Sequence, residues 1–211
     1  MSILDRLVDW IIGPDDDEAP AAAAAPRKRR RPITLPDDEE EEDLLTPQVE
    51  SLLTERLGAP ADAWDAPEGG LVTRVLRYDA EPAHRVWVSR GLRAWRRPHE
   101  LVVRLRADGE APAWPRALLL ALDARTRELD HTIALGEIVA DLAVEGAPWR
   151  HFLMVPDPVL EWIEDPFAPD GGLAFVQVVP LTDAQLAEMA DEAGRTALLA
   201  AWSQEDHLLL V

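Results

Sequence analysis

Apolar residues three and four positions apart indicate an amphipathic helix soon after residue 46. Thr46 is a suitable N-cap, and Pro47 fits the first helical position, where a missing N–H costs nothing. Gly58 is expected to end the helix, because glycine adopts the left-handed conformation of a C-cap without strain. The pattern therefore predicts a helix from 47 to 57.

The rest of the chain alternates between strand-like and helix-like patterns. After a predicted loop at 59–70, β-branched and alternating residues predict strands at 71–78, 84–90, 100–106, 138–144, 151–155 and 173–179. In 100–106 the alternation is typical of a strand buried on one face only. Helical spacing predicts a helix opened by Pro115 and running to about 130, and a final helix at 183–202.

The corner between the last strand and the last helix carries several local signals. Pro180 lacks a backbone donor and is expected to end the strand pairing. Thr182 and Gln185 have the spacing of a capping box, and Leu181 and Leu186 have that of a hydrophobic staple. The question is whether this corner is an active-site device or a structural one.

Strands with helices before, between and after them predict an α+β domain, a mixed β-sheet flanked by helices, over residues 47–211. Residues 1–12 differ, because their apolar positions form one helical stripe: Ile3, Leu4, Leu7, Val8 and Ile11. Such a short amphipathic helix on a tether is expected to dock either on a partner or on the body of the protein.

Residues 13–46 form a low-complexity linker of charged blocks and alanine, which predicts disorder. Its "RKRRR" run at 27–31 is compatible with a nuclear signal or a nucleic-acid patch. We favour a polyampholyte tail, in which the basic block attracts the acidic blocks on either side.

The composition of the chain excludes some classes of ligand and of site. The formal net charge of −19 argues against nucleic acid as the main ligand, since phosphate binding needs Lys and Arg. It favours a basic protein partner, or serves solubility. The absence of cysteine excludes disulfides and thiolate zinc sites. With no signal-peptide pattern and no apolar run long enough to span a membrane, we expect a soluble, cytoplasmic protein.

No catalytic motif stands out. The five histidines are spread along the chain, and "HELVV" at 99–103 has a valine where a zincin needs its second histidine. A phosphate-binding glycine loop and a G-x-S-x-G elbow are both missing from the sequence. We therefore predict no catalytic residue, no metal and no cofactor.

One segment of the chain is basic, although the chain as a whole is acidic. Residues 84–106 hold seven arginines and two tryptophans with a single acid, Glu100. Arginine and tryptophan are enriched in interface hot spots. The candidate partner-binding residues are Trp87, Arg90, Arg93, Trp95, Arg96 and Arg97. The alternative is that the arginines offset neighbouring acids while the tryptophans belong to the core.

Six ordered segments together resemble the bacterial suppressor of fused domain family over about residues 50–202. They are "VWVSRGL", "HELVVRLRADGEAPAW", "PRALLLALDARTREL", "HTIALGE", "FLMVPDP" and "VQVVPLTDAQLAEMADEAGRTALLAAW". The resemblance marks a signature turn containing His131, Thr132 and Gly136, which we expect to be structural.

This resemblance implies binding without catalysis. The animal relative is two-lobed and holds a peptide as an added strand, whereas this chain is similar to one lobe. Bacterial members of the family are thought to be immunity proteins that neutralise secreted toxins. The resemblance thus favours a toxin-neutralising binding protein; the alternative is an adaptor or chaperone of a secretion system, or a scaffold, that recruits its partner through residues 3–12.

Overall fold

The computed structural model describes residues 42–81, 83–92, 99–129, 133, 135–160, 163–164, 172–190 and 192–205. The helices are α2 (Glu42–Leu57), α3 (Trp114–Leu129), α4 (Asp183–Glu188) and α5 (Glu192–Glu205). The strands are β1 (Asp62–Asp65), β2 (Arg74–Ala80), β3 (His84–Arg90), β4 (His99–Arg106), β5 (Ile138–Val139), β6 (His151–Pro156), β7 (Ile163–Glu164) and β8 (Gly172–Leu181).

The strands form the predicted mixed sheet, in the order β1-β2-β3-β4-β8-β6-β5. Only the β4–β8 pair of this path is parallel, and β7 pairs with β8 outside the path. The sheet and its helices confirm the predicted α+β class.

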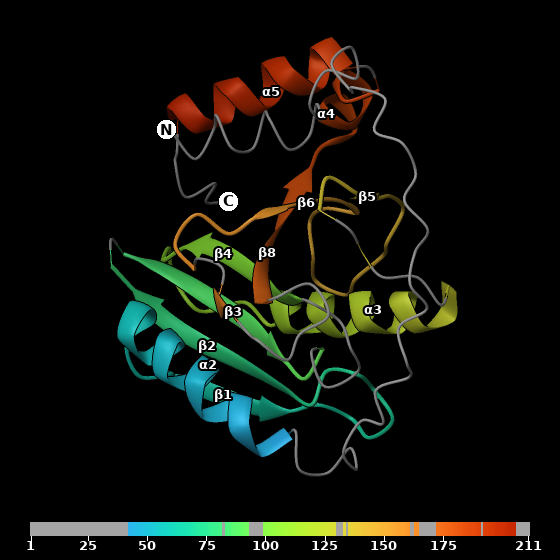
Figure 1. Cartoon of the computed structure of the whole chain (residues 1–211). Coiled ribbons are helices and arrows are strands. Elements are labelled where there is room, and N and C mark those ends of the chain that lie inside the picture. Colours follow the sequence, from blue (N-terminus) through green and yellow to red (C-terminus); the bar gives the residue numbers. More distant parts are fainter. Residues whose placement is uncertain are drawn as a thin grey trace, which may run out of the picture.

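Helices cover both faces of the sheet (Figure 1). On one face α3 packs its leucines against a cluster that includes Trp87, Leu101, Met154 and Val176. On the other face α2 places Leu53 among a second set of buried residues, which includes Tyr78, Val88, Val102 and Phe175. Burial on two faces makes β3 and β4 the centre of the core.

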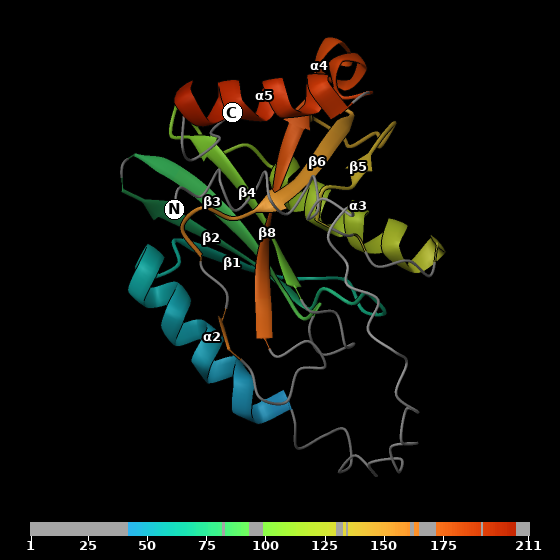
Figure 2. The same cartoon turned by 45° about the horizontal axis from the view of Figure 1, so that its top comes forward.

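The last strand, β8, joins two parts of the sheet. Its first half pairs with β4, and its second half pairs with β6. Val179 and Leu181 share a face with Phe175, because alternate residues of a strand point the same way. There they form a third cluster with Leu153 and Met189, which α5 partly covers (Figure 2).

The first helix begins earlier than predicted. It starts at Glu42, so that Pro47 lies inside the helix and residues 42–46 belong to it rather than to the linker. Its end is confirmed: Gly58 has a φ of 83°, and its N–H donates to the Thr54 carbonyl at 2.9 Å. The predicted helix at 1–12 and the linker up to residue 41 lie outside the described residues.

The strand predicted at 71–78 begins only at Arg74 and runs to Ala80, as β2. Three other segments differ more clearly from the predictions. The segment predicted as a loop at 59–70 contains β1, whose central Trp64 pairs with Val75. The strand predicted at 138–144 is only the two-residue β5. The single helix predicted at 183–202 is two helices, since α4 ends after six residues. These are short elements or breaks, which hydrophobic periodicity signals weakly.

The corner after β8 is a structural cap. The Thr182 hydroxyl accepts the Gln185 N–H at 3.2 Å, and the Gln185 side chain accepts the Thr182 N–H at 2.8 Å, which confirms the capping box. The prediction that Pro180 ends the pairing was wrong, because Pro180 pairs with Phe152 in β6. Among the described residues β8 has a strand on one side only there, so the missing donor breaks no second ladder.

Candidate functional site

The structure separates the predicted arginine and tryptophan residues. Trp87 is 1% exposed and lies in the core under α3, so its prediction as a partner contact was wrong. It lies on β3, which is covered on both faces. Arg90 is half-buried at the end of the same strand. Arg93, Trp95, Arg96 and Arg97 lie outside the described residues, and their role stays a prediction.

Glu100, the single acid between residues 84 and 106, is buried at the start of β4. Its carboxylate accepts the Ser89 hydroxyl at 2.6 Å and the Gly91 N–H at 2.9 Å. Ser89 in turn accepts the Leu101 N–H at 2.8 Å. Gly91 has a φ of 113°, and a Cβ there would meet the Leu71 carbonyl at 2.6 Å. Glu100 therefore holds a glycine-dependent turn where β3 ends.

Burial raises the pKa of Glu100 from 4.5 to about 7. Loss of hydration penalises the charged form most, while the positive charge of Arg90 and the hydrogen bonds from Ser89, Gly91 and Leu92 favour it. An acidic residue with a strongly shifted pKa can mark an active site. Here the donors that surround the carboxylate belong to the turn it stabilises, which indicates a structural role.

A second buried polar cluster crosses the middle of the sheet. Arg104 donates to both carboxylate oxygens of Asp157 at 2.7 Å, and both side chains are fully buried. The guanidinium also lies 2.7 Å from Nε2 of His84. Asp157 Oδ1 further accepts the N–H groups of Val159 and Leu160 at 3.0 and 2.7 Å. This cluster ties β4 to the segment after β6.

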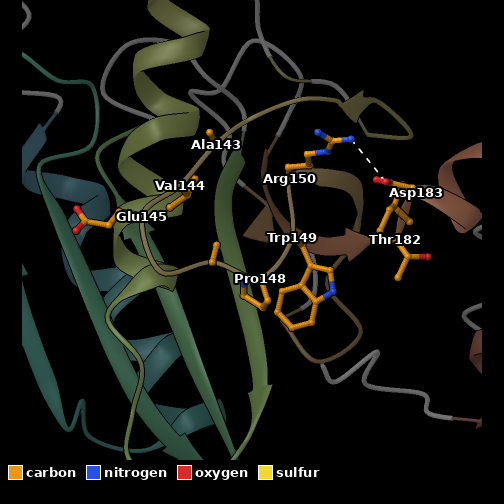
Figure 3. Close-up of a pocket in the computed structure, with 10 residues that line it drawn as sticks. Ala143, Val144, Glu145, Pro148, Trp149, Arg150, Thr182 and Asp183 are labelled. Atoms are coloured by element: carbon orange, nitrogen blue, oxygen red, sulfur yellow. Dashed lines mark ion pairs between the residues drawn. The ribbon is translucent and has the colours of Figure 1, made fainter.

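A groove of about 680 Å³ lies at the end of the β6–β8 pair (Figure 3). We call it the 143–150 groove. It lies between the β5–β6 connection and the start of α4, and the capped corner forms one side. Its lining residues are Ala143, Val144, Glu145, Ala147, Pro148, Trp149, Arg150, Leu181, Thr182 and Asp183.

Trp149 gives the groove a fixed aromatic wall. Its ring packs edge-on against Trp114 at the start of α3, with centroids 5.6 Å apart and an interplanar angle of 63°. This geometry is a favourable one for an aromatic pair. Because Trp114 is itself buried against the core, Trp149 is held in place while remaining only half-buried.

Charged side chains form the rim. Figure 3 shows the guanidinium of Arg150 turned toward Asp183, at 3.6 Å, and Arg150 also lies 3.8 Å from Asp141. His151 Nδ1 accepts the Asp141 N–H at 3.2 Å, and its Nε2 lies 3.0 Å from Asp183 Oδ1 and 3.2 Å from Nε of Arg150. The imidazole thus joins the connection to the corner, and Arg150 and Asp183 stay largely exposed.

Sequence reasoning missed this groove. Trp149 and Arg150 lie between two predicted strands, in a connection with no periodicity, and only their residue types hinted at an interface. The corner at 180–186 was noticed for its capping box, but its position beside Trp149 depends on the sheet order.

The signature turn is partly described. Gly136 has a φ of 76°, and its N–H donates to the Met154 carbonyl at 2.7 Å, which ties the turn to β6. The structural role of the turn stays a prediction. His131 and Thr132 lie outside the described residues.

The described part of the chain contains no group of three or more His, Cys, Asp or Glu residues placed to hold a metal ion. It also has no helix long and apolar enough to cross a membrane.

Comparison with known proteins supports the expected family. A family model described as suppressor of fused protein (SUFU) matches residues 73–211, which are more than half of the chain. The match begins just before β2 and omits α2 and β1. No curated protein matches the chain significantly. The chain belongs to the suppressor of fused protein family, whose domain is a protein-interaction module.

Proposed function

We propose that this protein is a non-catalytic binding domain of the immunity type, which neutralises a bacterial toxin by direct contact. The proposal rests on one observation: the chain belongs to a protein-interaction family, and its domain presents the 143–150 groove on the surface. The toxin would insert a bulky side chain against Trp149 and exchange polar contacts with Arg150 and Asp183.

The groove has the composition of an interface. Binding energy concentrates where an aromatic or arginine side chain is held rigidly at the centre of a patch that excludes water. Trp149 is braced by Trp114, and the exposed ion pair of Arg150 and Asp183 lies beside it. A partner can therefore gain apolar contact without first ordering this surface.

Charge supports a basic target. The chain carries a formal net charge of −19, and complementary potentials speed the encounter of two proteins. A basic toxin, such as a nuclease, fits this field. The association rate should then fall as salt is added, because ions screen the attraction.

The non-catalytic part of the proposal is supported by how the buried polar groups are used. Glu100 bonds to Ser89 and to the Gly91 backbone, and Asp157 bonds to Arg104 and to two backbone N–H groups. Each of these contacts joins elements of the fold.

The candidate toxin for the test would be a basic secreted protein encoded beside this gene. Ala143 is exposed and lines the groove, so Ala143→Trp fills the groove without removing a packed side chain. Ala61 is also exposed but lies next to β1, at the opposite edge of the sheet, so Ala61→Trp is the matched control. We expect Ala143→Trp to weaken binding at least about tenfold, as the loss of a hot-spot contact does, and to abolish protection of cells.

Equal affinities of the two variants for the toxin would show that the groove is not the binding surface. Failure of the unaltered chain to bind the neighbouring toxin or to protect cells from it would contradict the immunity function itself. Both affinities are measured by calorimetry, after circular dichroism has shown that the variants fold.

The apolar stripe at 3–12 favours a second candidate, an adaptor or chaperone of a secretion system. Removal of residues 1–41, which leaves α2 intact, separates the two functions. An adaptor that recruits its partner through the stripe should lose that partner. An immunity protein that binds through the groove should keep its affinity for the toxin.

A further inference from the structure

The charged side chains at the rim of the 143–150 groove do not balance. Arg150 lies between two carboxylates, 3.6 Å from that of Asp183 and 3.8 Å from that of Asp141. All three side chains are largely exposed, by 59% for the arginine and 76% for each aspartate. His151 adds no charge while its Nδ1 accepts the Asp141 N–H. One cation between two carboxylates leaves one negative charge in excess, and this charge attracts a further cation.

Trp149 places an aromatic ring beside these charges. The ring is braced by its edge-on contact with Trp114 and remains half-buried. Figure 3 shows it bordering the same space as Arg150 and Asp183, whereas the carboxylate of Glu145 points away from it. The face of an indole ring attracts a cation that lies within about 6 Å of the ring centre. The groove therefore combines an aromatic wall with an excess carboxylate.

The backbone at Asp141 is strained next to this rim. Its φ is 56°, and among the described residues every other positive φ belongs to a glycine. Aspartate tolerates this left-handed region better than most residues do, and the hydrogen bond from its N–H to the buried His151 holds it there. Strain that the surrounding structure maintains is found most often where a protein binds a ligand. This observation is independent of the charges and points to the same rim.

We infer that the partner residue that enters the 143–150 groove is an arginine, whose guanidinium lies on the Trp149 ring and pairs with Asp183. Arg150 then keeps its contact with Asp141, and the excess negative charge is neutralised. This assignment rests on the binding function proposed above and adds the chemistry of the bound side chain. The groove of about 680 Å³ falls within the range of roughly 300–1,000 Å³ for pockets that enclose a small ligand. It therefore has room for the whole arginine side chain.

Other side chains fit this surface less well. The ammonium of lysine is compact and strongly hydrated, whereas a guanidinium is planar, stacks on an aromatic ring and donates two N–H groups to one carboxylate. A leucine or phenylalanine would cover Trp149, but it would also remove water from Asp183 without replacing the lost hydrogen bonds. An acidic side chain would be repelled by the carboxylates on both sides of Arg150.

Two short peptides test the arginine without the toxin. N-acetyl-Gly-Arg-Gly-amide and the matched lysine peptide are titrated into the ¹⁵N-labelled full chain, and the indole N–H signal of Trp149 is followed by NMR. Its loss in Trp149→Phe assigns the signal. We expect the arginine peptide to shift this signal together with the backbone amides of 149–151 and 183. Its dissociation constant should be at least about twofold below that of the lysine peptide.

A pair of substitutions tests the carboxylate. Asp183→Asn removes the charge but keeps the size of the side chain, and it should raise the dissociation constant of the arginine peptide about two- to fivefold. Asp65→Asn makes the same change in net charge at an exposed position of β1, at the opposite edge of the sheet, and should leave the constant unchanged. Equal shifts with the two peptides, no shift of Trp149 with either, or equal effects of the two substitutions would overturn the inference.

The same variants separate this inference from the immunity function. If the toxin binds the unaltered chain and Ala143→Trp prevents it, the groove is the binding surface whichever side chain enters it. Toxin binding that Asp183→Asn leaves unchanged would then overturn the arginine alone. A toxin that fails to bind the unaltered chain would contradict the immunity function, while the peptides still report whether the groove takes an arginine.

Discussion

The protein contains two clusters built from the same three residue types. Arg104, Asp157 and His84 meet in the middle of the sheet, where the arginine and aspartate are fully buried and 2.7 Å apart. Arg150, Asp183 and His151 meet at the rim of the groove. There the arginine and aspartate side chains are 59% and 76% exposed and lie 3.6 Å apart.

Environment gives these identical groups different roles. In the core, each charge has lost its hydration and depends on its partner, so the pair can only serve the fold. At the rim, water solvates both charges and the pair contributes little to stability, so either charge is free to turn toward a partner protein. Residue type alone therefore does not distinguish a structural cluster from a binding surface; burial does.

The largest effect should follow from breaking the buried pair. Asp157→Ala leaves the Arg104 charge in the core without its carboxylate and leaves the N–H groups of Val159 and Leu160 without their acceptor. We expect the free energy of unfolding to fall by about 3–5 kcal/mol, measured by urea denaturation. The matched substitution at the rim, Asp183→Ala, should cost about 1 kcal/mol or less.

A further variant tests why Asp157→Ala is costly. Replacing both Arg104 and Asp157 by leucine removes the two charges together and should recover part of the loss, because no uncompensated charge remains. If Asp157→Ala and Asp183→Ala destabilise the protein equally, burial does not set the difference between the clusters.

Glu100 provides an intermediate case, a buried carboxylate surrounded mainly by neutral donors. Its pKa is about 7 in the folded protein against an ordinary value of 4.5, so the folded state binds this proton more tightly than the unfolded state. Its contribution to stability is therefore greatest below pH 4.5 and falls as the pH rises through 7. The total change is about 3 kcal/mol.

Glu100→Gln should remove this pH dependence while keeping the shape of the side chain. The amide oxygen still accepts the Gly91 N–H, and the amide nitrogen donates to Ser89 instead of accepting from it. In the unaltered protein, Glu100 should lower the free energy of unfolding by about 3 kcal/mol between pH 5 and pH 8. The variant should lack this contribution, so its free energy of unfolding should change less between the two pH values. Parallel pH profiles would show that Glu100 does not titrate in this range.

The comparison also explains how far the sequence could predict this protein. The long strands β3 and β4 and the helix α3 were predicted almost to the residue, because their apolar periodicity is strong. The same periodicity predicted that β4 would be buried on one face only, which would leave Arg104 exposed. It lies in the core because Asp157, 53 residues away, supplies the countercharge.

The contacts around the 143–150 groove could not be predicted from local sequence patterns either. Trp149 and Trp114 are 35 positions apart, and His151 reaches Asp183 across the β6–β8 pair. Such contacts follow from strand order and register, which local patterns do not encode. Trp87 was misassigned for the opposite reason: its residue type is enriched at interfaces, but its strand is buried on both faces. The capping box of Thr182 was correct because it is local.

The smallest effect should come from the ion pair of Arg150 and Asp183 at the rim of the groove. A double-mutant cycle isolates the interaction energy of this pair. Arg150→Ala, Asp183→Ala and the double variant should give a coupling energy below about 1 kcal/mol, since both side chains are exposed and 3.6 Å apart. The coupling should also weaken with added salt, because ions screen exposed charges. His151 keeps its contact with the Asp141 backbone in all three variants, which holds the connection in place. A coupling energy as large as the cost of Asp157→Ala would mean that the pair at the rim is held as rigidly as the buried pair. A partner could then contact neither charge without first breaking the ion pair.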